Sequence, residues 1–182
     1  MRIVQEDHKV TLSKWHEALQ EKRGARASLR RSTTVNDACL SEGFRSLLMQ
    51  THTLWKIDGQ EWRVTALALT AALAANVKAI DERQKFAAQL NGVMSELRFT
   101  RLCAVKTPDE LLRQLRRAVK LSNGAVNLFS LAEDIFCWCR EQDDLLSHHR
   151  RQQRSTEFLR IRWALEYYQA GDTDNDNDNE QD

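Results

Sequence analysis

The chain has 182 residues, 42% of them hydrophobic, which suits one compact domain or two small lobes that share a core. One proline, six glycines and no alternating runs of β-branched residues favour helices and exclude an extensive sheet. The most apolar run, residues 64–77, is shorter than the roughly 20 residues that span a bilayer, which excludes a membrane-spanning transporter or channel.

The apolar spacing predicts four helices in the first half of the chain. They cover residues 11–22, 42–50, 64–80 and 81–90. The third is apolar on nearly every side, which is typical of a buried central helix. Asn91-Gly92 marks the junction between an N-terminal lobe (1–91) and a C-terminal lobe (92–170).

Four more helices are expected in the second half. They cover residues 93–105, 108 to about 122, 127–140 and 157–169. The clearest start is at Thr107-Pro108, where Thr suits the N-cap, Pro suits the first helical position and two acids follow. Residues 141–156 are predicted to be a polar connection. The expected fold is all-α, a compact two-lobed helical bundle.

Charge is distributed unevenly along the chain. The net charge is +1, but residues 171–182 carry six acids and no base, and alternating Asp and Asn cannot build a core. We therefore expect a disordered acidic tail and a folded part with a surplus of about seven positive charges. An N-terminus without an apolar signal segment, and cysteines on apolar helical faces, predict a cytoplasmic protein.

A basic side is predicted on the helix that starts at Thr107. Its cations fall within an arc of roughly 100°, opposite a leucine side: Arg113, Arg116, Arg117 and Lys120. A solvated face is the alternative, but like charges at i, i+4 cost a few tenths of a kcal/mol each and no acid lies between Leu111 and Leu121. The pattern favours an external anion, and we expect contact with nucleic acid.

Other cations extend this prediction. Arg98 and Arg101 lie in the preceding predicted helix, and they would share the surface if the two helices form a hairpin, with Lys106 at its rim. The segment "RGARASLRR" (23–31) carries four arginines among small residues that allow close approach to a phosphate. An exposed loop with arginines explains this segment equally well, and residues 148–154 are better explained as a solvated connection.

Signs of catalysis or metal binding are weak. Cys137-Trp138-Cys139 with His148-His149 suggests zinc, but the two cysteines differ by about 200° around a helix, so both cannot face one ion. The aspartates of the tail lack the glycine and the final glutamate of a calcium loop. No standard nucleotide-binding or hydrolase motif occurs. We predict no catalytic residue, no metal and no cofactor.

Four segments in order resemble the CasB family, the small subunit of the type I-E CRISPR surveillance complex, Cascade. They are "W..AL.EKRGARASLRR" (15–31), "MSELRFTRLCAVKTPDELLRQLRRAV" (94–119), "VNLFSLAEDIFCW" (126–138) and "RIRWALEYY" (160–168). The resemblance covers residues 12–170. The polar stretch 141–156 and the acidic tail depart from it.

This resemblance implies an all-helical, non-catalytic protein of antiviral defence. Two copies would pack head to tail in the complex and contact its backbone and large subunits. Basic faces would help hold the guide-RNA-bound target DNA strand and the displaced strand of the R-loop. Carried onto this sequence, that role falls on Arg30, Arg31, Arg98, Arg101, Arg113, Arg116 and Arg117.

Two other functions stay open at the level of sequence. A stand-alone helical DNA-binding regulator would need a recognition helix with base-reading side chains, and Gln114 is the only hint of one. A structural adaptor would use the same basic faces to bind acidic protein partners.

Overall fold

The computed structural model describes residues 2–148 and 158–177, and this part of the chain is almost entirely helical. The helices are α1 (Glu6–Glu21), α2 (Arg23–Arg31), α3 (Val35–Cys39), α4 (Glu42–Thr51), α5 (Glu61–Ala74), α6 (Phe86–Gln89), α7 (Glu96–Cys103), α8 (Pro108–Leu121), α9 (Leu128–Leu146) and α10 (Leu159–Asn177). Two short strands, β1 (Ala79–Ile80) and β2 (Ala125–Val126), pair in parallel. The all-α prediction is confirmed.

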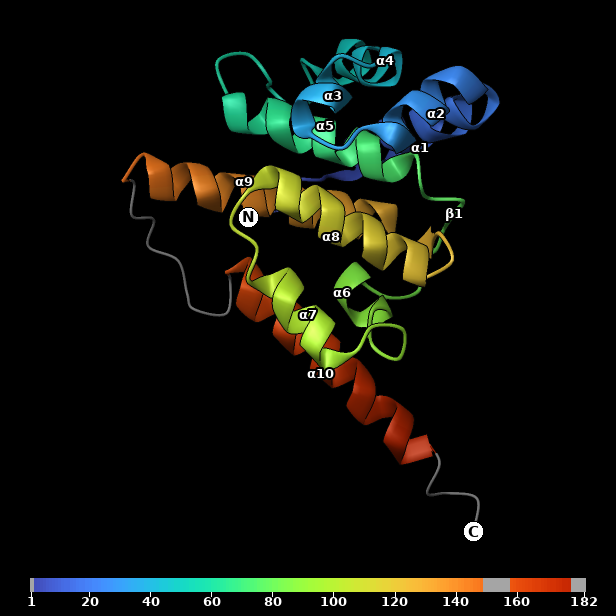
Figure 1. Cartoon of the computed structure of the whole chain (residues 1–182), viewed down its shortest axis with the longest axis vertical. Helices are drawn as coiled ribbons and strands as arrows, with labels where there is room; N and C mark the ends of the chain where they lie inside the picture. Colours follow the sequence, from blue (N-terminus) through green and yellow to red (C-terminus); the bar gives the residue numbers. More distant parts are fainter. Residues whose placement is uncertain (1, 149–157, 178–182) are drawn as a thin grey trace.

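The helices form three layers (Figure 1). Helices α1 to α5 lie at one end, α8 and α9 cross the middle, and α6, α7 and α10 lie at the other end. Helix α5 packs against both α8 and α9, and α10 packs against α6. One continuous cluster of buried apolar side chains runs through all three layers, so α5 is the buried central helix that its composition predicts.

Helix α5 ends at Ala74, six residues before its predicted end, and the prediction of a helix over 81–90 is wrong except for α6. The chain leaves the helix because it pairs with a distant segment: Lys78 N–H donates to the Gly124 carbonyl at 2.8 Å. Gly124 has a φ of +79°, and a Cβ there would meet the Asn76 carbonyl at 3.0 Å. Glycine is therefore required at this crossing.

Two short helices lie where the sequence predicts no helix. The arginine-rich segment is helix α2, which rules out the alternative of an exposed loop, and α3 starts four residues after it, at Val35. Ala, Leu and Arg are good helix formers, and Gly24 falls in the first turn of α2, where it costs little. Helix α3 starts with a capping box in which Thr34 and Asp37 bind each other's backbone N–H.

The second half follows its predicted order of helices, with different ends. Helix α8 begins at Pro108 as expected, and the Thr107 hydroxyl accepts from the Glu110 N–H at 3.3 Å. Helix α9 continues to Leu146, so the first third of the predicted polar connection is helical, and α10 continues to Asn177. Residues 149–157 and 178–182, with the rest of the connection and of the tail, lie outside the described residues.

Polar contacts anchor α10 to the body. The Asp134 carboxylate, 3% exposed, accepts hydrogen bonds from the Arg162 guanidinium and, at 2.8 Å, from the Trp163 indole. Burial raises the pKa of Asp134 to about 7, while the charge of Arg162 opposes this shift and favours the carboxylate. Lys85 pairs with Glu166 at 2.9 Å. These contacts fix α10 against α9 and the segment before α6.

Candidate nucleic-acid interface

Helix α8 separates an apolar side from a basic side, as its sequence predicts. The apolar side is buried in the core through Leu111, Leu112, Leu115, Ala118 and Val119. Arg113, Arg117 and Lys120 are exposed on the opposite side. Packing of the leucines therefore fixes the direction in which these three cations point.

Arg116 has different surroundings from its neighbours on α8. It is half-buried, and its Nη2 donates to the Ser32 carbonyl at 2.6 Å. Burial lowers the pKa of its guanidinium below the ordinary value. Because Ser32 is the C-cap of α2, Arg116 holds the end of α2 against α8. Arg116 is therefore less exposed than the other three cations of α8 and also links α2 to α8.

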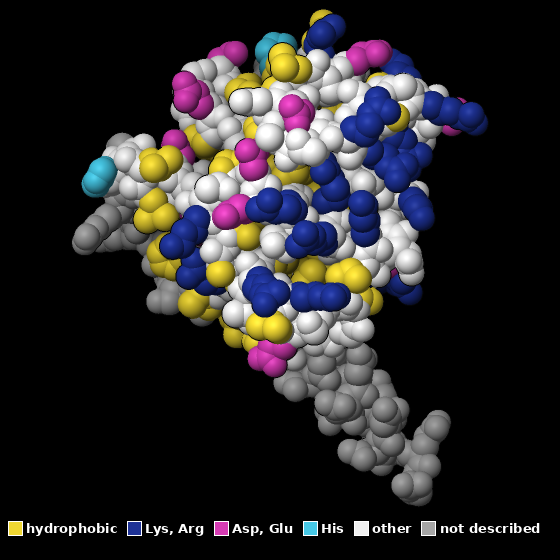
Figure 2. All heavy atoms as spheres, in the orientation of Figure 1, with side chains coloured by type: hydrophobic (Ala, Val, Ile, Leu, Met, Phe, Trp, Pro, Cys, Tyr) yellow, Lys and Arg dark blue, Asp and Glu magenta, His cyan; other side chains and the backbone are white. Residues whose placement is uncertain are grey.

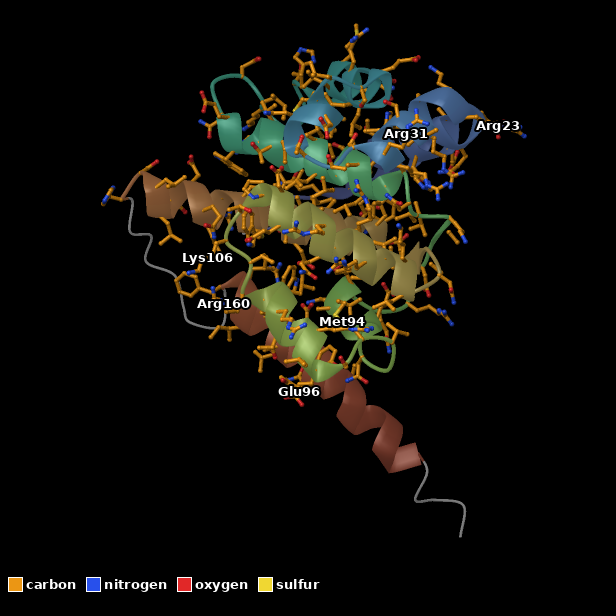
Figure 3. All side chains as sticks on the ribbon, viewed as in Figure 1. Arg23, Arg31, Met94, Glu96, Lys106 and Arg160 are labelled. Atoms are coloured by element: carbon orange, nitrogen blue, oxygen red, sulfur yellow. The ribbon has the colours of Figure 1, made fainter. Side chains whose placement is uncertain are left out.

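A second hydrogen bond fixes the same corner. The Val35 N–H, at the start of α3, donates to Asp109 Oδ1 in the first turn of α8 at 2.8 Å. Together with the Arg116 contact it places the last turn of α2 beside α8. Arg30 and Arg31 are exposed in that turn, and Figure 3 shows Arg31 at this end of α2. The two arginines at the end of α2 are thus brought near the cations of α8.

Helix α7 completes the surface. It buries Phe99 and Leu102 and contacts α8, while Arg98 and Arg101 are exposed. Figure 2 shows that Lys and Arg side chains gather over α2, α8 and α7 on one face of the molecule. The hairpin expected from the sequence thus brings the cations of both helices onto one surface.

We call this surface the basic face. It consists of Arg30, Arg31, Arg98, Arg101, Lys106, Arg113, Arg117 and Lys120, all of them exposed. Within residues 2–148 and 158–177, none of these side chains forms an ion pair or a hydrogen bond. The face therefore presents eight cations whose charges are not neutralised by a bonded acid.

The sequence did not single out one cation near this face. Arg160, in α10, is exposed and lies close enough to the Cys103 thiol, at the end of α7, to affect its pKa. Figure 3 places Arg160 and Lys106 on the same side of the molecule. Arg160 is 54 residues from Lys106 in the chain, so only the docking of α10 brings it near, and no sequence pattern connects the two.

The remaining candidate sites lie elsewhere. Cys137 and Cys139 are each 3% exposed in the core, and burial raises the pKa of Cys137 to about 12, so they are core thiols as expected. His149 lies outside the described residues. Within the described ranges, no three His, Cys, Asp or Glu side chains are placed to hold a metal ion. Gln114, the hint of base reading, is half-buried.

Comparison with known proteins supports the resemblance seen in the sequence. The family model of CRISPR-associated protein Cse2 matches residues 25–168, which include every cation of the basic face. No curated protein and no solved structure matches the chain. In the part of the chain that the structure describes, no helix is long and apolar enough to cross a bilayer. The chain belongs to the Cse2 family, also called CasB, which is the small subunit of the type I-E Cascade complex.

Proposed function

We propose that this Cascade subunit has no catalytic activity of its own and holds nucleic-acid backbone on its basic face. Its ligands are the guide-bound target strand and the displaced strand of the R-loop. The observation that carries the proposal is the set of eight exposed cations from α2, α7, α8 and the α7–α8 connection, none with a bonded acid within the described residues. Family membership supplies the setting, a complex that binds guide RNA and target DNA.

The energetics of R-loop formation suit such a surface. The heteroduplex that forms is about as stable as the DNA duplex it replaces, so backbone contacts made by protein decide the balance. Phosphate contacts position a strand without reading its sequence. Arg suits this task because it stays charged and binds phosphate through two N–H groups. Besides Arg30 and Arg31 at the end of α2, the basic face has two arginines on α7 and two on α8. These two helices therefore form its centre.

The dimensions of α8 fit several phosphates. A helix of 14 residues is about 21 Å long, whereas each strand of a duplex carries one phosphate per roughly 3.4 Å of the duplex axis. A duplex aligned with α8 would therefore present about six phosphates of one strand along the length of the helix. Arg113, Arg117 and Lys120 are spaced by three or four residues, so successive cations meet successive parts of one strand.

The first prediction concerns Arg113 and Arg117. The double substitution Arg113→Gln and Arg117→Gln removes two exposed charges and no structural contact. We expect the affinity for a fluorescent single-stranded oligonucleotide to fall roughly tenfold or more at 0.1 M salt. The slope of log affinity against log salt falls by about 1.4, because each phosphate contact on a single strand contributes about 0.7. Fluorescence anisotropy at four salt concentrations measures both.

The control removes the same charge elsewhere. Lys14 on α1 and Arg45 on α4 are exposed cations of the layer farthest from α7 (Figure 1). Lys14→Gln with Arg45→Gln leaves both affinity and slope close to the wild type. Equal losses in both pairs would show attraction by net charge alone. Unchanged binding by the Arg113 and Arg117 variant would contradict the proposal and favour an adaptor that binds acidic proteins.

The same variants test the protein inside its complex. We propose that the chain contacts the backbone and large subunits and a second copy of itself. An apolar surface along α10 and the residue before it suits such contacts: Phe158, Ile161, Leu165 and Tyr168 are each 42–47% exposed. If the basic face binds backbone, the Arg113 and Arg117 variant still assembles into the complex but forms R-loops more weakly. Protection of a defined operator by the isolated chain would instead support a stand-alone regulator.

A further inference from the structure

We propose that the acidic segment 171–182 of the same chain binds the basic face and competes there with nucleic acid. This inference rests on the proposed function, because it assigns a second ligand to the same surface. The segment carries six acids and no base, and the rest of the chain has an excess of positive charge. Exposed cations without bonded acids are the complementary surface for such a segment.

The end of α10 that leads into this segment is fixed beside α7. The Tyr168 hydroxyl donates to Glu96 Oε1 at 2.9 Å, and the rings of Tyr167 and Phe99 stack with centroids 4.0 Å apart. The Tyr167 hydroxyl also donates to the Met94 carbonyl at 2.6 Å. Figure 3 shows Met94 and Glu96 at the start of α7. The acidic segment therefore begins three residues after Tyr168, which contacts the first residue of α7.

The segment is long enough to cover the centre of the basic face. Twelve extended residues reach at most about 40 Å. Helix α7 is about 12 Å long and α8 about 21 Å. Residues 171–182 can thus follow α7 and reach the cations of α8 while α10 stays docked up to Tyr168.

Binding requires residues 171–177 to leave the helical path that continues α10 to Asn177. Figure 1 shows that this end of α10 extends beyond the other helices. Gly, Thr, Asp and Asn are poor helix formers. Acids at a helix C-terminus also oppose the helix dipole. The helix in this sequence is therefore only weakly favoured over an extended segment that pairs with cations.

The loss of nucleic-acid affinity caused by a tethered segment can be estimated. A short tether gives its segment an effective concentration in the millimolar range. A segment that binds the face with a dissociation constant of some tenths of a millimolar then weakens nucleic-acid binding by about threefold to tenfold. Salt screens both interactions, so the effect is largest at low ionic strength.

The experiment compares three full-length proteins. The test variant is Asp174→Asn, Asp176→Asn and Asp178→Asn, which keeps the length of the segment. The control variant is Glu17→Gln, Glu42→Gln and Asp58→Asn, which removes three exposed acids from the N-terminal half. We expect the test variant to bind a single-stranded oligonucleotide about threefold to tenfold more tightly than the wild type at 50 mM salt. The control variant binds like the wild type, and all three converge at 0.5 M salt.

A second readout does not use nucleic acid. A labelled peptide of residues 171–182 is titrated with the full-length test variant, whose own segment has lost three acids. Binding in the submillimolar range is expected, and it is lost when Arg98→Gln and Arg101→Gln are introduced into that chain. Peptide binding that these substitutions leave unchanged would overturn the basic face as the site of the segment.

The outcomes separate this inference from the proposed function. Equal oligonucleotide binding by the wild type and the test variant would overturn competition by the segment and leave the proposed function standing. No oligonucleotide binding by any of the three proteins would overturn the proposed function itself. An effect that disappears on dilution of the protein would show contact between copies and overturn binding within one chain.

Discussion

Arg116 and Arg117 are consecutive residues of α8 with opposite surroundings. Arg117 is exposed, whereas Arg116 is half-buried and its guanidinium donates to the backbone carbonyl that ends α2. A helical projection places both on the basic side, because it shows direction around one helix and nothing of the neighbouring element. The contact with Ser32 depends on how α2 docks, so the sequence could not separate the two arginines.

This difference gives a prediction about stability. Arg116→Leu removes a charged hydrogen bond and leaves the Ser32 carbonyl without this donor, so the free energy of unfolding should fall by about 1–2 kcal/mol. Arg117→Leu removes no contact and should change it by no more than about 0.5 kcal/mol. Urea denaturation followed by circular dichroism measures both. A loss in the Arg117 variant equal to that in the Arg116 variant would contradict the assignment.

Among the elements, α10 depends most clearly on a buried charge. Asp134 of α9 binds two side chains of α10, Arg162 and Trp163, and only 3% of the carboxylate side chain is exposed. Removing Asp134 takes the acceptor away from both side chains, although Arg162 keeps an ion pair with Glu166 at 4.0 Å. Asp134 is therefore a buried anchor of α10, the helix that also carries the Tyr167–Phe99 contact to α7.

Asp134→Ala should lower the free energy of unfolding by about 3–5 kcal/mol. Backbone amides of α10 should then exchange with deuterium faster than those of α1, because the lost contacts are local to α10. The comparison is Arg83→Ala, which breaks an ion pair whose arginine side chain is 87% exposed and which should leave the free energy of unfolding nearly unchanged. An Asp134 variant as stable as the Arg83 variant would contradict the anchoring role.

Elements differed in how far the sequence could predict them. Helix α8 was predicted to its first residue because Thr107, Pro108 and the following acids act locally. The end of α5 was missed because β1 pairs with β2, 46 residues away, and no local signal marks that pairing. For the candidate site, the wheel of α8 predicted which cations point outward. That these cations share a surface with the arginines of α2 and α7 depends on how the three helices dock, which the sequence does not show.

At the scale of the molecule, the described parts of both halves contribute to one core, as expected for one domain or for two lobes that share a core. Helix α5, before the predicted junction at residue 91, packs against α8 and α9, which follow it. The Glu133 carboxylate on α9 also accepts backbone N–H groups of Ile3 and Val4. Helix α6, from the first half, packs against α10, from the second. Each half therefore buries apolar surface that only the other half covers.

We accordingly predict that the two halves unfold together. The loss of ellipticity at 222 nm and the change in tryptophan fluorescence should coincide in urea, because Trp15 of α1 and Trp163 of α10 border the same core. A fragment of residues 92–182 should show no cooperative transition alone, since it lacks α5, the partner of both α8 and α9. Two separate transitions, or a cooperatively folded fragment, would show instead that residue 91 separates independent folding units. The basic face would then be built on the second unit, and the hydrogen bonds of Arg116 and Asp109 would join the end of α2, with Arg30 and Arg31, to that unit.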